Sequence, residues 1–116
     1  MCFGKNTPIL LKNGKHKPIQ EILVGDILSN ESIVTGIMKL SSRDQELYDV
    51  NGVLVTEKHR IFHPELGLIQ ASSHPLAIKI NDFREQYVYC INTSTKRIQI
   101  GEDIYMDWDD LDTVDT

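Results

Sequence analysis

Cys2-Phe3-Gly4-Lys5-Asn6-Thr7-Pro8-Ile9 opens the chain and decides how the remainder is interpreted. A cysteine this close to an end is an unusual place for a buried structural thiol, because chain ends fray unless another element holds them. The residues from Thr7 to Leu11 have the composition of a strand that would hold this end in place. A thiol held beside its own peptide bond can attack the carbonyl that precedes it. The opening therefore predicts a self-processing domain whose substrate is its own N-terminal peptide bond.

A second segment, Val53-Leu54-Val55-Thr56-Glu57-Lys58-His59, supplies the residue types that such an attack needs. The amide nitrogen must be protonated as it leaves, and histidine is the side chain that most often does this near neutral pH. The hydroxyl of Thr56 can hydrogen-bond the scissile amide or hold the imidazole of His59. The spacing alone also allows a plainer arrangement, in which Thr56 caps a short turn and His59 is a surface residue.

Cys90 is the second cysteine of the chain and lies in an apolar, strand-like run. Buried free cysteines commonly act as small hydrophobic residues, and that is one interpretation of Cys90. The other is a second thiol near Cys2, serving as a relay nucleophile, a redox partner or a modulator of the site. We therefore include Cys90 with Cys2, Thr56 and His59 among the candidate catalytic residues.

A structural zinc site is a further alternative, built from both cysteines, His59 and either His63 or His74. Neither a Cys-x-x-Cys nor a His-x-x-x-His pair supports it, so no metal or cofactor is predicted. Paired carboxylates, a phosphate-binding loop and a Gly-x-Ser-x-Gly elbow are also missing from the sequence.

The length and composition favour one ordinary globular domain. The chain has 116 residues, 41% hydrophobic and 25% charged, and no apolar run approaches the roughly 20 residues of a membrane-spanning helix. With a formal net charge of -5 and no basic stripe, nucleic acid and membranes are not expected partners. Two cysteines favour a reducing, intracellular setting, although they permit one bridge. We expect a monomer with one domain over residues 1–108 and an acidic tail over 109–116.

Short strand-like runs closed by turn residues recur along the chain, and no segment keeps a helical period, so the predicted class is all-β. The two Asn-Gly pairs, Asn13-Gly14 and Asn51-Gly52, are typical of hairpins whose two central residues have positive φ. The first half of the segment from Lys17 to Leu28 predicts a short helical turn that ends at Gly25. Strands are expected at 7–11, 32–40, 47–50, 53–56, 60–62, 68–71, 76–80, 86–92, 97–100 and 104–108.

Two of these runs resemble each other. Val34-Thr35-Gly36-Ile37-Met38-Lys39 and Val88-Tyr89-Cys90-Ile91-Asn92-Thr93 share valine and isoleucine at matching positions. Such an internal similarity is typical of a fold built from two related halves.

The combined motifs resemble the Hint family, the module shared by inteins and hedgehog autoprocessing domains. The opening Cys2-Phe3-Gly4 with Thr7-Pro8-Ile9 is similar to the first block of the family. The later blocks are matched, in the family's order, by Lys17-Pro18-Ile19 with Val24-Gly25-Asp26-Ile27-Leu28, by Val55-Thr56-Glu57-Lys58-His59-Arg60-Ile61 and by Val88-Tyr89-Cys90-Ile91.

The resemblance implies a flat, horseshoe-like all-β fold with pseudo-twofold symmetry. It also implies that Cys2 is the nucleophile of an N-to-S acyl shift, that Thr56 and His59 assist cleavage of the amide, and that Cys90 occupies a position tied to assisting or branching chemistry. The implied partners are a covalently fused upstream protein segment and a small nucleophile, water or a thiol.

Two departures from the family narrow the expected reaction. Splicing inteins end in His-Asn before a new nucleophile, whereas the matching region here is Ile104-Tyr105-Met106-Asp107-Trp108, with no asparagine to cyclise. The hedgehog pattern places an aspartate where this chain has Lys39, and that disfavours transfer to a sterol. The prediction is therefore N-terminal autocleavage through a thioester, in a single turnover. The alternative is a Hint-like interaction module that has lost the reaction.

Overall fold

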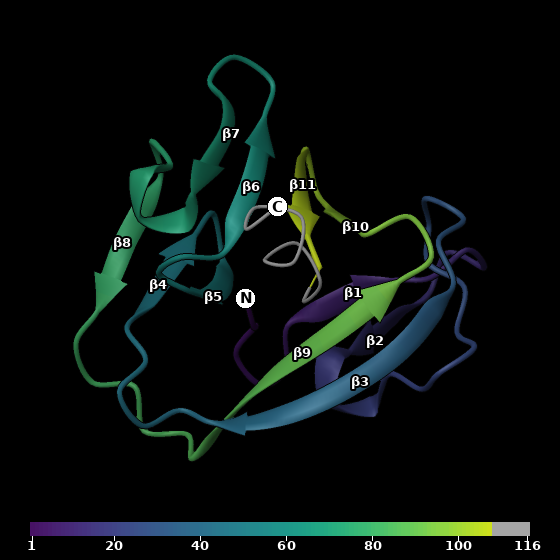
Figure 1. Ribbon diagram of the computed structural model, residues 1–116, viewed down its shortest axis with the longest axis horizontal. Helices are drawn as coiled ribbons and strands as arrows, with labels where there is room; N and C mark the ends of the chain where they lie inside the picture. Colours follow the sequence, from purple (N-terminus) through teal and green to yellow (C-terminus); the bar gives the residue numbers. More distant parts are fainter. Residues whose placement is uncertain (108–116) are drawn as a thin grey trace, which may run out of the picture.

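The structure is a computed structural model, and it describes residues 1–107. Its regular secondary structure consists almost wholly of short β-strands (Figure 1), which confirms the predicted all-β class. The predicted tail, 109–116, and Trp108 lie outside the described residues. The strands are β1 (Pro8–Leu10), β2 (His16–Pro18), β3 (Val34–Ser41), β4 (Leu47–Val50), β5 (Val53–Thr56), β6 (Arg60–His63), β7 (Gly67–Gln70), β8 (Ala77–Ile80), β9 (Tyr87–Thr93), β10 (Arg97–Ile100) and β11 (Asp103–Met106).

The two longest strands, β3 and β9, form an antiparallel pair. It sets Val34 opposite Thr93 and Ile37 opposite Ile91. The two segments that resemble each other in sequence are therefore direct partners. An antiparallel pair of equivalent strands is the arrangement that a local twofold axis between them produces. The two similar segments therefore lie where the expected pseudo-twofold symmetry would place them.

Two larger sheets flank this pair. One has the order β10-β11-β6-β7 and the other β5-β4-β8, while β1 and β2 form a separate ribbon. Figure 1 shows the strands arranged around the N-terminal segment in a horseshoe-like curve, with β3 and β9 along one side.

The N-terminal segment is held between β5 and β9. Phe3 forms isolated antiparallel bridges with both Val55 and Tyr89, and its N–H donates to the Tyr89 carbonyl at 2.8 Å. Gly4 follows at a point where a side chain has no room, because a Cβ there would lie 2.7 Å from Leu54 Cβ. The chain end is therefore anchored on both sides, and Gly4 permits the close approach.

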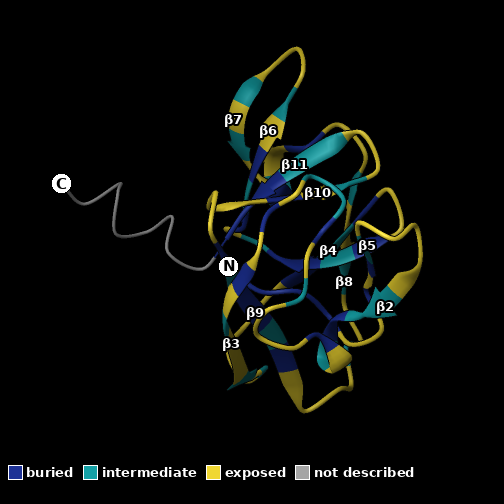
Figure 2. Cartoon of the chain, turned by 90° about the vertical axis from the view of Figure 1, so that its right-hand side faces the viewer, coloured by how far each residue is buried: buried dark blue, intermediate teal, exposed yellow. Residues whose placement is uncertain are grey.

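The main core is formed by residues from the N-terminal segment and from several of the strands. Phe3, Val55, Ile61 and Ile91 are buried in it together with Tyr105. Figure 2 shows the buried segments gathered in the interior and the exposed ones at loops and hairpin tips such as that of β6 and β7. Phe3 thus packs as a core residue only two positions from the start of the chain.

The two Asn-Gly pairs behave differently. Asn51 and Gly52 have φ of 52° and 88°, as a two-residue hairpin turn requires. The turn between β1 and β2 extends over 11–15, and there Gly14 has positive φ while Asn13 does not, so the prediction of two positive φ values is wrong at this turn.

The predicted helical turn is a 3-10 helix over Ile19–Glu21, which ends before Gly25. The Leu23 N–H donates to the Asp26 carboxylate at 2.9 Å instead of extending the helix. The same carboxylate binds Lys17, and these hydrogen bonds lower the pKa of Asp26. The helix thus ends at Ile22, which has an extended backbone, and the Asp26 carboxylate holds the turn that follows.

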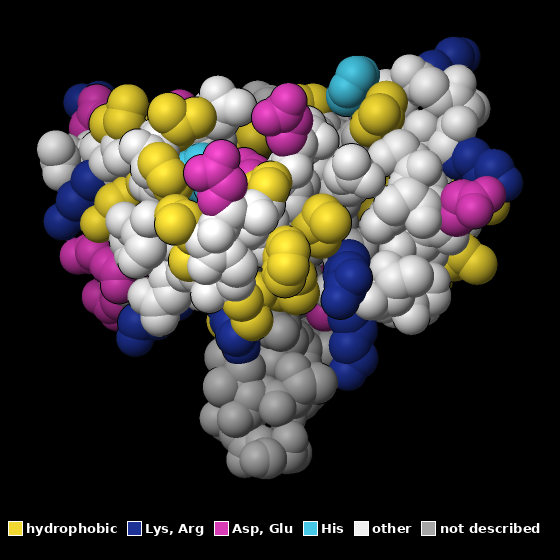
Figure 3. Space-filling view, turned by 90° about the horizontal axis from the view of Figure 1, so that it is seen from above, with side chains coloured by type: hydrophobic (Ala, Val, Ile, Leu, Met, Phe, Trp, Pro, Cys, Tyr) yellow, Lys and Arg dark blue, Asp and Glu magenta, His cyan; other side chains and the backbone are white. Residues whose placement is uncertain are grey.

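The described surface mixes apolar and charged side chains. Phe62, Leu66 and Leu68 on the β6–β7 hairpin are among the exposed hydrophobic residues. Figure 3 shows hydrophobic side chains lying among acidic and uncharged ones on the face it presents. None of the helices within residues 1–107 is long and apolar enough to cross a membrane.

Candidate functional site

The backbone of Cys2 is bound on both sides by Thr56, the last residue of β5. The Cys2 N–H donates to Thr56 Oγ1 at 3.1 Å, and the Thr56 N–H donates to the Cys2 carbonyl at 3.0 Å. Both residues are buried. The nitrogen that Thr56 holds belongs to the peptide bond between Met1 and Cys2. Thr56 is therefore placed to orient that amide.

His59 also lies against the Cys2 carbonyl and is completely buried. Its Nε2 is 2.7 Å from the Met106 carbonyl oxygen, and its Nδ1 is 3.4 Å from the Cys2 carbonyl oxygen. A carbonyl accepts, so the shorter contact places the proton of the neutral ring on Nε2. Nδ1 then faces the Cys2 backbone with a free lone pair.

The surroundings of His59 keep its ring neutral. Its ring centroid is 4.6 Å from that of Phe3 and 5.5 Å from that of Tyr105. Burial lowers the pKa of His59 to about 3, and the nearby N-terminal ammonium adds to this, although the hydrogen bonds to Met106 and Cys2 partly oppose it. Burial also raises the pKa of the Tyr105 hydroxyl. Neither ring carries a charge at neutral pH.

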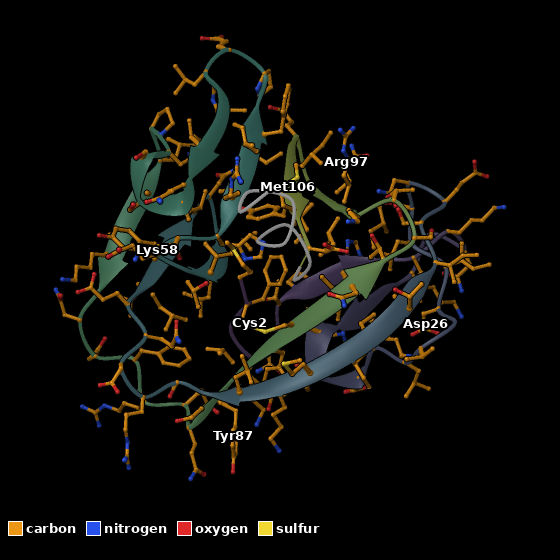
Figure 4. All side chains as sticks on the ribbon, in the orientation of Figure 1. Cys2, Asp26, Lys58, Tyr87, Arg97 and Met106 are labelled. Atoms are coloured by element: carbon orange, nitrogen blue, oxygen red, sulfur yellow. A yellow bond between two sulfur atoms is a disulfide. The ribbon has the colours of Figure 1, made fainter. Side chains whose placement is uncertain are left out.

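Cys90 lies directly against Cys2. The two residues form a disulfide, with their Cα atoms 4.4 Å apart, and Figure 4 shows Cys2 beside β9, with Met106 on β11 on the opposite side of the site. The interpretation of Cys90 as a free apolar thiol is therefore wrong, and the permitted single bridge is present. The other interpretation places Cys90 near Cys2, and the structure has this arrangement. The pairing of Phe3 with Tyr89 sets the two cysteines side by side.

The end of β11 completes the site with groups that sequence motifs did not identify. The Met106 carbonyl anchors His59, and a backbone carbonyl leaves no signal in the sequence. Asp107 follows, fully buried, and its Oδ2 accepts from the Thr93 N–H at 2.8 Å. Its own N–H donates to the Lys96 carbonyl at 3.1 Å. The Asp107 position, which had no assigned role, joins β11 to β9 and to the turn that follows it.

The residues of the proposed zinc site are not brought together. Both cysteines are in the disulfide, and both nitrogens of His59 face carbonyl groups. His74 donates from Nε2 to Asp103 at 3.0 Å, and its ring packs against His63. Within residues 1–107, no group of three or more histidine, cysteine or acidic residues is placed to hold a metal ion.

A cleft of about 520 Å³ lies beside Met1. Its walls come from the end of β5 and from the loop before β4. They include Asp44, Glu46, Glu57 and Lys58. The carboxyl groups of Glu46 and Glu57 hydrogen-bond each other, which raises the pKa of Glu57. The peptide bond before Cys2 is therefore next to open, predominantly acidic space.

The chain has an intein-like, or Hint-type, all-β fold. The solved structures to which the chain is similar include the crystal structure of the MchDnaB-1 intein, with a TM-score of 0.64 over 90% of this chain and 98% of the other. The identity is 12%, so this similarity establishes the fold. No protein-family profile matches the sequence, and no curated relative is found.

Proposed function

We propose that this domain cleaves the peptide bond before Cys2 by an N-to-S acyl shift, with Cys2 as nucleophile and Thr56 and His59 assisting. The observation that carries the proposal is the position of the Cys2 amide. Its N–H is bound to Thr56 Oγ1 at 3.1 Å, and the unprotonated Nδ1 of His59 faces the same residue. The intein-like fold supports a self-processing role in general.

The first step starts from the free thiol of Cys2. Its sulfur attacks the carbonyl carbon of the preceding residue, a carbon–sulfur bond forms and the carbon–nitrogen bond breaks. The thiol proton passes through His59 Nδ1 to the departing nitrogen of Cys2, which becomes an amine. A neutral imidazole can accept that proton. Its low pKa makes the imidazolium a strong acid that transfers the proton onward.

Thr56 prepares the amide for this step. Its Oγ1 holds the scissile nitrogen while its N–H fixes the carbonyl of Cys2. The nitrogen is therefore held in one orientation before the attack. Fixed geometry of this kind lowers the barrier because less freedom is lost on reaching the transition state.

The second step releases the upstream segment. Water or a small thiol attacks the thioester carbonyl, and Cys2 leaves as the thiol. The upstream segment is the covalently fused partner in this proposal, and the cleft beside Met1 provides room for it. Asparagine-driven cleavage at the other end is not part of this proposal, because the matching region, Ile104-Tyr105-Met106-Asp107-Trp108, contains no asparagine.

The test uses the full chain with a reporter protein joined directly to Cys2. Dithiothreitol is a poor probe because it both reduces disulfides and attacks thioesters. A phosphine reductant should therefore be combined with hydroxylamine, which attacks thioesters without reducing the disulfide. The expected product is the reporter with a C-terminal hydroxamate, identified by mass spectrometry.

Cys2→Ala is the matched control, since it removes the sulfur and keeps the backbone hydrogen bonds. It should give no hydroxamate. Equal release from the wild-type and Cys2→Ala fusions, or no release from either after reduction, would overturn the proposal and leave the interaction-module alternative.

A further inference from the structure

The bond between Cys2 and Cys90 joins the proposed nucleophile to a residue with no step in the acyl transfer. Both side chains lie in a small apolar cluster with Leu47 and Val88, and they are 2% and 1% exposed. A sulfur in a disulfide is not a nucleophile, because attack requires the thiolate. The same bond that stabilises the N-terminal segment therefore prevents the proposed reaction.

We infer that Cys2 and Cys90 form a reversible redox switch, which holds the domain inactive when oxidised and permits cleavage when reduced. This inference rests on the proposed function. The oxidant is a low-molecular-weight disulfide such as oxidised glutathione. Each closure converts two protein thiols and one small disulfide into the protein disulfide and two small thiols, so two electrons and two protons leave the protein. Reduction by two small thiols reverses this exchange.

The surface around the pair determines which sulfur is attacked. A hollow of about 170 Å³ is lined by Gly36, Ile37, Met38, Cys90 and Asn92. A neighbouring groove of about 290 Å³ also reaches Cys90. Cys2 lines neither of them. An incoming thiolate therefore reaches the sulfur of Cys90 first, and Cys2 is displaced as the thiolate.

Attack on the sulfur of Cys90, and not on that of Cys2, determines how the domain is activated. The first attack leaves the mixed disulfide on Cys90 and releases Cys2 at once in its nucleophilic form. In the closing direction, the small disulfide reacts first with Cys90, and Cys2 then displaces the small thiol. Attack on the other sulfur would instead block Cys2 with the small thiol until a second exchange.

Asn92 provides a recognition group in the hollow. Its side-chain Oδ1 is buried and has no hydrogen-bond partner among the described residues. Buried polar atoms are nearly always paired, so this oxygen is available to accept an N–H. Glutathione is a peptide thiol and brings backbone N–H groups to the sulfur that it attacks. The hollow therefore suits a peptide thiol better than a thiol without amide groups.

The first test measures modification without using cleavage. Cys2→Ser and Cys90→Ser variants of the full chain are exposed to oxidised glutathione, and the adducts are located by mass spectrometry. The Cys2→Ser variant should acquire glutathione at Cys90 at least tenfold faster than the Cys90→Ser variant acquires it at Cys2. Equal rates, or faster modification of Cys2, would overturn the proposed direction of attack.

Substitutions of Met38, which lines the hollow, test the route by which the small thiol reaches the disulfide. Met38 is paired with Cys90 across the β3–β9 ladder and is 40% exposed. Met38→Trp should cover the hollow and slow reduction of the disulfide by glutathione severalfold, whereas Met38→Ala should not. Unchanged reduction in both variants would show that the thiol reaches the bond by another route.

The second test uses the reporter fusion in oxidised and reduced forms. Oxidised wild-type protein should release no hydroxamate with hydroxylamine alone, and the phosphine should restore release. Cys90→Ser should release with hydroxylamine in both conditions. Equal release from oxidised and reduced wild-type protein would overturn the switch while the proposed function stands. No release from reduced wild-type protein would mean that the proposed function itself fails. Release from reduced wild-type protein but not from Cys90→Ser would give Cys90 a part in the reaction and would overturn the inference that it acts only as the switch.

Discussion

Two chain segments meet at His59 and contribute different groups. On one side, the Cys2 N–H is held by the Thr56 hydroxyl, and the Cys2 carbonyl oxygen lies 3.4 Å from Nδ1 of the ring. On the other side, the end of β11 contributes the Met106 carbonyl to Nε2 and the buried carboxylate of Asp107 to the Thr93 N–H. In the proposed reaction, the first side presents the bond to be cleaved, and the second fixes the groups around it.

In the proposed reaction, the two sides have separate tasks. The hydrogen bond on Nε2 fixes the ring of His59, so that Nδ1 faces the backbone of Cys2. A backbone carbonyl provides that anchor irrespective of the side chain at Met106. The proposed N-terminal cleavage therefore needs no asparagine on the C-terminal side.

Removing His59 should give the largest change and tests whether the N-terminal side carries the chemistry. His59→Ala should slow hydroxamate release from the reduced fusion by about 10²–10⁴-fold, the usual contribution of proton transfer by a positioned residue. His59→Gln is the matched control, because its amide can donate to Met106 but cannot shuttle a proton. Wild-type rates in a folded His59→Gln protein would contradict the assigned role.

The pH dependence of the free energy of unfolding tests whether the ring of His59 is buried away from water. Its pKa is about 3 when folded and 6.5 in the unfolded reference, so below 6.5 the unfolded chain binds more protons. The pH-dependent contribution of His59 to the free energy of unfolding is therefore complete above pH 6.5, and it is lost as the pH falls towards 3. The loss is about 1.4 kcal/mol per pH unit well inside that window. Denaturant unfolding at several pH values measures it, and an equally steep fall in His59→Gln would assign it to other groups.

Asp107→Ala tests whether the C-terminal side only fixes the structure. The Thr93 N–H would lose its acceptor in a buried place, so the free energy of unfolding should fall by about 1–3 kcal/mol. The release rate of the reduced fusion should stay within about twofold at temperatures where the protein is folded. A large rate loss without a stability loss would place Asp107 in the reaction and remove the contrast between the two sides.

Thr56→Ala should lower the release rate much less than His59→Ala. It removes the acceptor of the Cys2 N–H but keeps the backbone hydrogen bond between the two residues. The loss of one hydrogen bond of about 1 kcal/mol corresponds to a release rate roughly fivefold to tenfold lower. Thr56→Ser retains the hydroxyl and should restore most of the rate, and failure to do so would point to packing of the methyl group instead.

The fold was predictable from local patterns, since most strands lie where apolar runs end at turn residues. The Asn51-Gly52 hairpin is one example, with both residues at positive φ. The turn at Asn13-Gly14 was less predictable, because residues 11–15 form a longer connection in which only the glycine needs a positive φ. The turn after the 3-10 helix is held by a hydrogen bond that the Asp26 carboxylate accepts from the Leu23 N–H, and no periodicity reveals such a contact.

The site was predictable where it depends on side-chain type. Cys2, Thr56 and His59 were identified from residue chemistry and from family resemblance, and the fold brings them together. The disulfide depends on the pairing of Phe3 with Tyr89, which places Cys2 beside Cys90 across long sequence separation. The anchoring of His59 uses a main-chain carbonyl of β11, which every residue type supplies. Such contacts follow from topology and cannot be identified from residue types.

The most direct measurement of the central claim is the rate of reporter release as a function of hydroxylamine concentration in the reduced fusion. If Cys2 first forms a thioester, the rate should rise and then reach a plateau set by the acyl shift. A different nucleophile, such as a small thiol, should reach the same plateau. A rate that increases linearly without limit and is equal in Cys2→Ala would show direct attack on the amide and would contradict the account.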